Sequence, residues 1–203
     1  ISNGKRKSLT KGQLLHAKND EPEGLYCVLS GKIRVSNFSQ DGKEMVLTWL
    51  DPGTWFGEIS LFDGLPRTHD SHAEHDSELL MVPTATFHDI LARRPEMYQY
   101  FIQLLCQRIR ATFALIDETG GLTLKGQLAK RLLLLSSSFG QQLEGFLNRD
   151  VEISQETLAH MLNSSRQTVN KLLQELQTEG IISVQYGRIR IEDEKTLQQL
   201  SQV

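Results

Sequence analysis

The sequence has few cysteines and no long hydrophobic run, and each shortage excludes a class of protein. Cys27 and Cys106 are the only cysteines among 203 residues, so one subunit cannot supply four thiolates to an iron–sulfur cluster. The apolar runs, of which Leu132 to Leu135 is typical, are far shorter than the roughly 20 residues that span a bilayer. No signal-peptide pattern opens the chain, and we expect a cytoplasmic protein without a membrane partner. The sequence begins at Ile1 rather than at a methionine, which leaves room for residues before it.

A basic excess is also absent. The formal net charge is −3 at pH 7, and residues 123–203 carry as many acidic as basic side chains. Domains that bind nucleic acid often have a net positive charge. Any contact with DNA must therefore come from a local patch rather than from bulk charge.

The residues that commonly carry catalysis do not form a recognisable set. Neither cysteine has a histidine and an acid at a familiar spacing. One segment alternates histidines with acidic residues: His69, Asp70, His72, Glu74, His75 and Asp76. A spacing of three gathers histidines only on a helix, whereas this segment fits a strand, and a jelly-roll metal enzyme would need His-x-His on one strand face. We expect no enzyme, no metal site and no covalent cofactor.

Short strand patterns fill the first 83 residues. The clearest, at 25–29, 32–37 and 44–50, are rich in β-branched and aromatic side chains. Turn signals separate them, among them Ser30-Gly31 and Asp41-Gly42, whose glycines suit the positive φ of hairpin turns. Short strands at this spacing predict a β-sandwich or barrel over residues 1–93.

A single long helix is predicted over residues 94–119. Its apolar positions alternate spacings of four and three, the heptad pattern of a coiled-coil seam: Tyr98, Ile102, Leu105, Ile109, Thr112 and Ile116. A second, mostly apolar row runs beside this seam and would let the helix pack on the β-domain. Its members are Phe101, Leu104, Arg108, Ala111 and Leu115. A seam this narrow favours a homodimer, and the alternative is a helix wholly buried within its own chain.

The third part, residues 120–203, begins at a hinge predicted at Gly120-Gly121. Helices are predicted over 125–138, after a serine cap at Ser154, and after a further cap at Ser164 or Ser165. A hairpin of residues 181–184 and 188–191 follows. Three helices and a hairpin are typical of a winged helix-turn-helix domain.

The second and third of these helices have the spacing of a DNA-reading motif, with a tight turn at 162–164 between them. In the third, Val169, Leu173 and Leu176 form an apolar face, and polar residues take the opposite face. Arginine suits guanine, glutamine suits adenine, and hydroxyls suit phosphates. The predicted DNA contacts are Gln155, Ser165, Arg166, Gln167, Thr168, Asn170, Lys171 and Arg188. The alternative is an ordinary solvated helix face.

Residues 56–68 have the chemistry of an anion site. Backbone amides near Gly57 and Ser60 can point at a phosphate, Arg67 can pair with its oxygens, and Thr68 can donate a hydroxyl bond. Glu58 would repel a phosphate but can accept a hydrogen bond from a ribose hydroxyl. A ligand with both a sugar and a phosphate is indicated, which is a nucleotide. The predicted binding residues here are Gly57, Glu58, Ile59, Ser60, Arg67 and Thr68. The alternative is a turn with an incidental surface ion pair between Glu58 and Arg67.

Over nearly its whole length the chain resembles the CRP/FNR family of bacterial transcription regulators. The resemblance is carried by Gly42-Lys43-Glu44-Met45, Phe56-Gly57-Glu58, Leu61-Phe62, Arg67-Thr68 and Ser165-Arg166-Gln167-Thr168-Val169. It implies an α+β fold with an N-terminal jelly-roll β-domain of the cyclic-nucleotide-binding type, a long dimerisation helix and a C-terminal winged helix-turn-helix. It also implies that Gly57, Glu58, Arg67 and Thr68 hold a cyclic phosphate and its ribose, that Thr112 reaches the adenine, and that RNA polymerase is a partner.

Three departures from the family pattern concern function. Phe113 stands where a serine often follows the threonine, and it can stack on a base but cannot donate a hydroxyl bond. The segment from His69 to His72 replaces small or apolar residues. Gln167 stands where the family has a glutamate. Glutamine favours adenine in the half-site, whereas glutamate favours cytosine.

We therefore expect a homodimeric transcription regulator in which a cyclic nucleotide, cyclic AMP, sets the affinity for a double-stranded DNA operator. One alternative keeps the regulator but gives it a vestigial pocket or a different effector. A further alternative is a cyclic-nucleotide-binding module of a kinase or channel that does not bind DNA.

Overall fold

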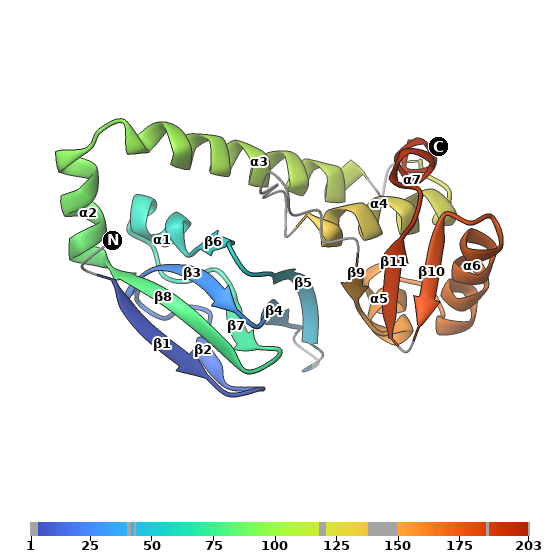
Figure 1. Ribbon diagram of the computed structural model, residues 1–203, viewed down its shortest axis with the longest axis horizontal. Helices are drawn as coiled ribbons and strands as arrows, with labels where there is room; N and C mark the ends of the chain where they lie inside the picture. The colour runs from blue at the N-terminus through green and yellow to red at the C-terminus, as the bar shows by residue number, and fades with distance from the viewer. Residues whose placement is uncertain are drawn as a thin grey trace. The chain divides into compact units, whose positions relative to one another are not determined.

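The computed structural model describes residues 4–39, 42, 44–117, 121–137, 150–185 and 187–202. Asp41 and Lys43, Gly120 of the predicted hinge and the last residue of the 125–138 helix lie outside the described residues. The chain divides into two compact units, Ile1–Cys106 and Gln107–Val203. The long helix α3 (Met97–Asp117) belongs to both (Figure 1). None of the described helices is long and apolar enough to cross a membrane.

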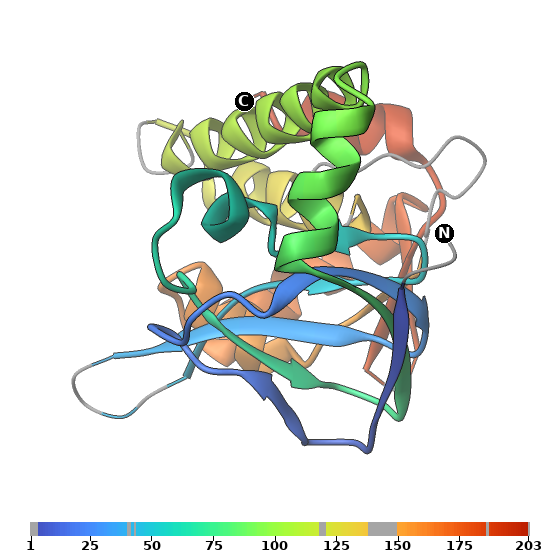
Figure 2. The ribbon, with the colours of Figure 1, turned by 90° about the vertical axis from the view of Figure 1, so that its left-hand side faces the viewer.

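Among the described residues of the N-terminal unit, eight strands form two antiparallel sheets (Figure 2). One sheet has the order β1-β8-β3-β6, which is Lys5–Leu9, Ser77–Pro83, Gly24–Ser30 and Trp55–Phe56. The other has the order β2-β7-β4-β5, which is Leu14–His16, Asp70–Ala73, Ile33–Phe38 and Glu44–Leu50. Every strand contributes to one shared core: Leu9, Leu15, Tyr26, Val28, Ile33, Leu50, Phe56, Ala73 and Leu79. The two sheets and their common core confirm the predicted β-domain.

The three strands predicted most clearly coincide with β3, β4 and β5 to within one residue at each end. The turn between β3 and β4 needs its glycine, because Gly31 has a φ of +82° and a Cβ there would overlap the backbone oxygen of Asp76. Strand β7 covers His72, as expected for the histidine-rich segment.

Two helices of this unit were not predicted: α1 (Glu58–Asp63) and α2 (Thr84–Arg93). Phe62 of α1, Phe87 of α2 and Phe101 of α3 pack edge to face, with ring centroids 5.2 to 5.4 Å apart. They cover a second buried cluster that includes Leu61 and Val82. This aromatic contact fixes the first half of α3 on the unit.

The second unit has the predicted winged helix-turn-helix. Helices α4 (Leu124–Ser136), α5 (Gln155–Met161) and α6 (Arg166–Thr178) are followed by the hairpin β10 (Ile182–Gln185) and β11 (Arg188–Ile191). Strand β9 (Asp150–Glu152) and helix α7 (Glu194–Leu200) extend the prediction, and β9 completes a sheet of order β10-β11-β9. The largest fully buried side chains of the described part of this unit are Leu128, Leu132, Leu158, Leu173, Leu176, Ile182, Ile189 and Leu197.

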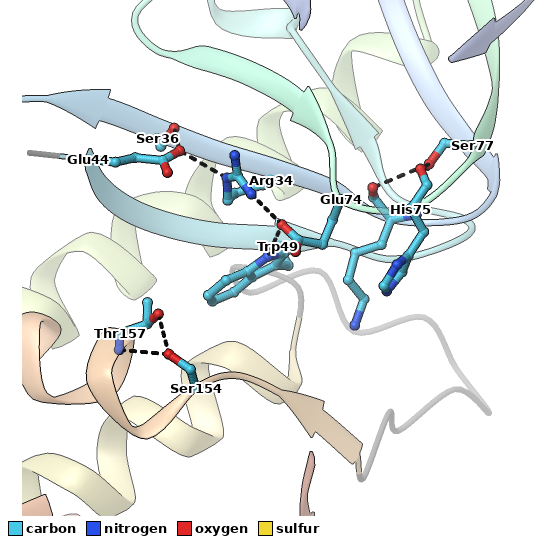
Figure 3. A network of polar contacts seen from close by, with 10 residues as sticks. Arg34, Ser36, Glu44, Trp49, Glu74, His75, Ser77, Ser154 and Thr157 are labelled. Carbon is cyan, nitrogen blue, oxygen red and sulfur yellow. Dashed lines mark hydrogen bonds and ion pairs between the residues drawn. The ribbon is translucent and has the colours of Figure 1, made fainter. Parts of the chain in front are cut away.

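Charged side chains on β4 and β5 take part in ion pairs (Figure 3). Arg34 of β4 donates from Nε to Glu44 Oε1 at 2.9 Å and from Nη1 to Glu74 Oε2 at 2.7 Å. Trp49 of β5 donates its indole N–H to the same Glu74 oxygen at 3.3 Å. This network ties β4 and β5 to the turn after β7.

Candidate nucleotide site and DNA-reading surface

Arg67 is the centre of the predicted anion site, and it is buried, with 3% of the residue exposed. Its Nη1 donates to the Gly57 carbonyl at 2.7 Å and its Nη2 to the Gly24 carbonyl at 2.6 Å. Burial lowers the pKa of Arg67, although Tyr26 and Glu58 act in the opposite direction. Glu58 is fully buried as well, so an exposed ion pair between Glu58 and Arg67 does not describe this site.

Gly57 allows α1 to begin directly beside the guanidinium. Its φ is +90°, and a Cβ at this position would lie 2.6 Å from Arg67 Nη1. Ser60 is buried and donates its hydroxyl to the Pro66 carbonyl at 3.2 Å, which ties α1 to the segment before Arg67. The first amides of any helix, here those of Glu58 to Ser60, lack an intrahelical acceptor. The structure therefore brings together Gly57, Glu58, Ser60 and Arg67, and we call these with Thr68 the Arg67 site.

The backbone around Arg67 is held by the loop between β2 and β3. Asn19 N donates to Arg67 O at 2.8 Å, and Arg67 N donates to Asp20 O at 2.9 Å. Lys18 N donates to Asp70 Oδ1 at 2.6 Å. Thr68, between these anchors, is exposed, and its Oγ1 lies 2.9 Å from His69 Nδ1. Ile59 is also exposed, on the first turn of α1.

Three aromatic side chains stack beside Arg67, and the sequence analysis assigned a role in the site to none of them. The Tyr26 ring lies 5.4 Å from Phe56 and 6.1 Å from His16 between centroids, and the Arg67 guanidinium carbon is 5.5 Å from the Tyr26 centroid. Tyr26 donates its hydroxyl to Glu23 Oε2 at 3.2 Å. Burial and Glu23 raise the pKa of Tyr26 to about 12, and burial and Arg67 lower the pKa of His16 to about 4. A tyrosine on a buried strand carries no local sign of such a role.

Thr112 and Phe113 lie on the second half of α3, and both are exposed. Thr112 donates its hydroxyl to the Arg108 carbonyl one turn earlier, at 2.9 Å. Four members of the heptad seam are exposed large apolar residues: Tyr98, Ile102, Ile109 and Ile116. The second row is less exposed, with Ala111 buried and Phe101 packed on the aromatic cluster. The approach of Thr112 and Phe113 to a base stays a prediction.

Two serine caps shape the DNA-reading motif. Ser154 Oγ accepts from Thr157 N at 3.0 Å and begins α5 (Figure 3), and Ser165 Oγ accepts from Thr168 N at 3.1 Å and begins α6. Asn163, in the turn between the helices, has a φ of +46°. The cap of the third predicted helix is thus Ser165, one of the two serines that the sequence allowed.

The predicted reading face of α6 is exposed, and its opposite face is the core. Val169, Leu173 and Leu176 are at most 1% exposed. The polar residues Arg166, Gln167, Thr168 and Lys171 are all exposed. Asn170 is half-buried instead, and its Oδ1 accepts from Gln155 Nε2 of α5 at 3.4 Å.

The wing carries one further predicted DNA contact, Arg188. Arg188 of β11 is exposed and paired with Glu152 of β9 at 2.5 Å. A groove of about 330 Å³ separates the wing from the start of α5 and α6, and Gln155, Arg166 and Gly187 contribute to its lining. The predicted contacts Gln155 and Arg166 therefore line one groove, whereas a shared DNA surface with Arg188 stays a prediction.

Comparison with known families matches both units. Residues 6–94 match the model of the cyclic nucleotide-binding domain, and residues 126–200 match the Crp-like helix-turn-helix domain. Together with the Arg67 site and the exposed face of α6, these matches define a DNA-binding transcription regulator with a cyclic-nucleotide-binding domain.

Similar proteins cover almost the whole chain. A CRP-like cAMP-activated global transcriptional regulator from Mycobacterium tuberculosis is 30% identical over 187 residues, 92% of this chain and 84% of that protein. The catabolite activator protein of Thermus thermophilus has a solved structure with a TM-score of 0.55 and 28% identity, covering 98% of this chain and 91% of that one. FixK2 from Bradyrhizobium japonicum, 18% identical with 97% and 96% covered, shares the fold at a TM-score of 0.78. The chain belongs to the CRP/FNR family of transcription regulators.

Proposed function

We propose that this regulator is a homodimer whose affinity for its DNA operator is set by cyclic AMP bound at the Arg67 site. The observation that carries the proposal is the state of Arg67. Its guanidinium is buried and oriented by two carbonyls and an aromatic ring, and its Nε has no hydrogen-bond partner among the described residues. A buried cation with donors to spare is suited to an anion that enters from outside.

The proposed ligand contacts follow from what each group can donate or accept. The cyclic phosphate would take the remaining N–H groups of Arg67, the hydroxyl of Thr68 and the first amides of α1. The Glu58 carboxylate would accept from the ribose hydroxyl. Thr112 and Phe113 would hold the adenine, by a hydrogen bond and by stacking respectively.

The exposed heptad seam of α3 supports the dimer. Ile102, Ile109 and Ile116 recur every seven residues, and each is more than half exposed in the single chain. Pairing two such helices would bury them. Two recognition helices related by a two-fold axis would read half-sites about 34 Å apart, and cyclic AMP would favour the arrangement that matches this spacing. An interaction with RNA polymerase stays a prediction.

The second candidate function is a transcription regulator that does not respond to cyclic AMP. Both terminal nitrogens of Arg67 already donate to the Gly57 and Gly24 carbonyls, so the site is partly satisfied by its own backbone. Phe113 also lacks the hydroxyl that often follows the threonine in this family. These two features favour a vestigial site or a different effector.

Calorimetric titration with cyclic AMP and cyclic GMP, combined with operator selection from random DNA, separates the candidates. Binding of cyclic AMP by the wild type and loss of binding in Arg67→Ala are expected. If Arg67→Ala and the wild type bind the selected operator equally, with and without each nucleotide, the vestigial site is the better description. Failure to select any DNA would favour a nucleotide-binding module without DNA binding.

A further inference from the structure

The histidine that follows Thr68 departs from the small or apolar residues that the family resemblance leads us to expect at this place in the Arg67 site. The Thr68 hydroxyl and the His69 ring nitrogen Nδ1 are 2.9 Å apart, a hydrogen-bond distance. The backbone on either side is fixed, because Arg67 is bonded to Asn19 and Asp20 and the Asp70 carboxylate accepts from Lys18 N. The two residues therefore lie between two hydrogen-bonded neighbours.

The direction of this hydrogen bond decides what Thr68 can offer to a ligand. A hydroxyl has one hydrogen to donate and two lone pairs to accept with. If Nδ1 accepts, the hydrogen of Thr68 is used up within the protein. If Nδ1 carries a hydrogen and donates it, the hydroxyl hydrogen remains for a phosphate oxygen, which can only accept.

The surroundings of His69 keep the ring neutral in the absence of ligand. Burial and the positive charge of Lys18 lower the pKa of His69, and the carboxylate of Asp70 acts in the opposite direction. A neutral ring can exchange between its two tautomers at little cost, so it can adopt whichever one a ligand requires.

We propose that His69 is a positioning residue of the nucleotide site, which donates from Nδ1 to Thr68 Oγ1 and so directs the Thr68 hydroxyl hydrogen at the phosphate. The inference rests on the proposed function, because it needs a phosphate at the Arg67 site. It assigns His69 a role in leaving the Thr68 hydroxyl hydrogen available to the ligand.

Three substitutions separate donation from simple packing. His69→Asn places an amide donor near the position of Nδ1 and should bind cyclic AMP within about twofold of the wild type. His69→Leu removes the donor and should weaken binding about fivefold, the effect of one neutral hydrogen bond. His69→Asp offers only an acceptor and a repulsive charge, so it should weaken binding by more than about tenfold.

The role through Thr68 is tested by a double-mutant cycle measured by calorimetry. In a Thr68→Val background, His69→Leu should change the affinity less than about twofold, since the hydroxyl that it orients is gone. His88→Leu, which removes an exposed histidine from α2, is the matched control and should bind like the wild type. The wild type should also bind more tightly as the pH falls through the pKa of His69, because an imidazolium Nδ1 always donates, and His69→Asn should lack this rise.

The outcomes are distinct. Equal affinity in the wild type and His69→Leu, or an equal loss with and without the Thr68 hydroxyl, would overturn the role of His69 alone. Absence of cyclic nucleotide binding by the wild type would overturn both this inference and the proposed function. A cooperative thermal transition in each variant shows that the comparison is made between folded proteins.

Discussion

The guanidinium of Arg67 lies over the ring of Tyr26, with 5.5 Å between its central carbon and the ring centroid, and both residues are at most 3% exposed. Cation–π contact of this kind is stronger when the pair is desolvated. Together with the carbonyls of Gly57 and Gly24 it leaves the side chain little conformational freedom. An arginine held in this way has little entropy left to lose when a phosphate binds.

The close approach of Gly57 to this guanidinium predicts that alanine is not tolerated there. Gly57→Ala would place a Cβ 2.6 Å from Arg67 Nη1 at a φ of +90°. We expect a loss of about 2 kcal/mol of unfolding free energy and a displaced Arg67 that no longer binds cyclic AMP. Denaturant unfolding and calorimetry measure the two effects.

Gly64→Ala is the control for backbone strain alone. Gly64 has a φ of +70°, and a Cβ at this position would have no atom within 4 Å among the described residues. The substitution should cost about 1 kcal/mol and leave nucleotide binding unchanged. If both alanine variants bind cyclic AMP equally, the contact between Gly57 and Arg67 has no role in the site.

The low pKa of His16 predicts a loss of stability in mild acid. The unfolded chain takes up this proton near the ordinary pKa of 6.5, whereas the folded chain does so only near pH 4. Within this window the unfolded state binds more protons, so stability falls as the pH falls, by up to about 3 kcal/mol from this group. His16→Gln should reduce the pH dependence of the free energy of unfolding between pH 4 and 6.5, as measured by denaturant unfolding. If the wild type and His16→Gln show the same pH dependence, the pKa of His16 is not lowered in the folded protein.

Gln167 predicts which base the recognition helix prefers. It is exposed near the start of α6, where a glutamine suits adenine and a glutamate suits cytosine. Gln167→Glu should therefore change the preferred base at one position of each half-site from adenine to cytosine, and the affinities for the two bases should differ by about tenfold or more. Gln174→Glu, exposed farther along the same helix, should select the same operator as the wild type. An unchanged operator for Gln167→Glu would remove this residue from the reading face.

The α3 seam predicts the oligomeric state. Ile109 is 52% exposed at the centre of the seam, and Ile109→Glu would place a charge in the paired helices. We expect the dimer dissociation constant to rise by at least about tenfold in sedimentation experiments. Gln107→Glu, exposed on α3 but outside the seam, should remain a dimer. A wild type that sediments as a monomer at all concentrations would contradict the homodimer.

Local chemistry explains which parts could be predicted from the sequence. The caps at Ser154 and Ser165 and the strands β3 to β5 depend on residues that are close in the chain, and the predictions agree with the structure. Helix α1 could not be found by periodicity, because six residues contain fewer than two turns. Glu58 and Arg67 belong to one short motif, and their roles toward a ribose and a phosphate stay predictions.

Long-range contacts account for what was missed. Arg67 donates to the carbonyl of Gly24, 43 residues earlier, and lies over Tyr26 on the same strand. No pattern in either segment points to the other, so the sequence predicted an arginine open to a phosphate rather than one already held by carbonyls. The hydrogen bond from Gln155 to Asn170, which joins two predicted DNA contacts on different helices, was missed for the same reason.

The most direct test is the affinity of the selected operator for the wild type and for Arg67→Ala, measured by fluorescence anisotropy with and without saturating cyclic AMP. The account predicts that cyclic AMP changes the wild-type affinity at least about fivefold and leaves that of Arg67→Ala unchanged. Equal wild-type affinities in the two conditions would contradict it.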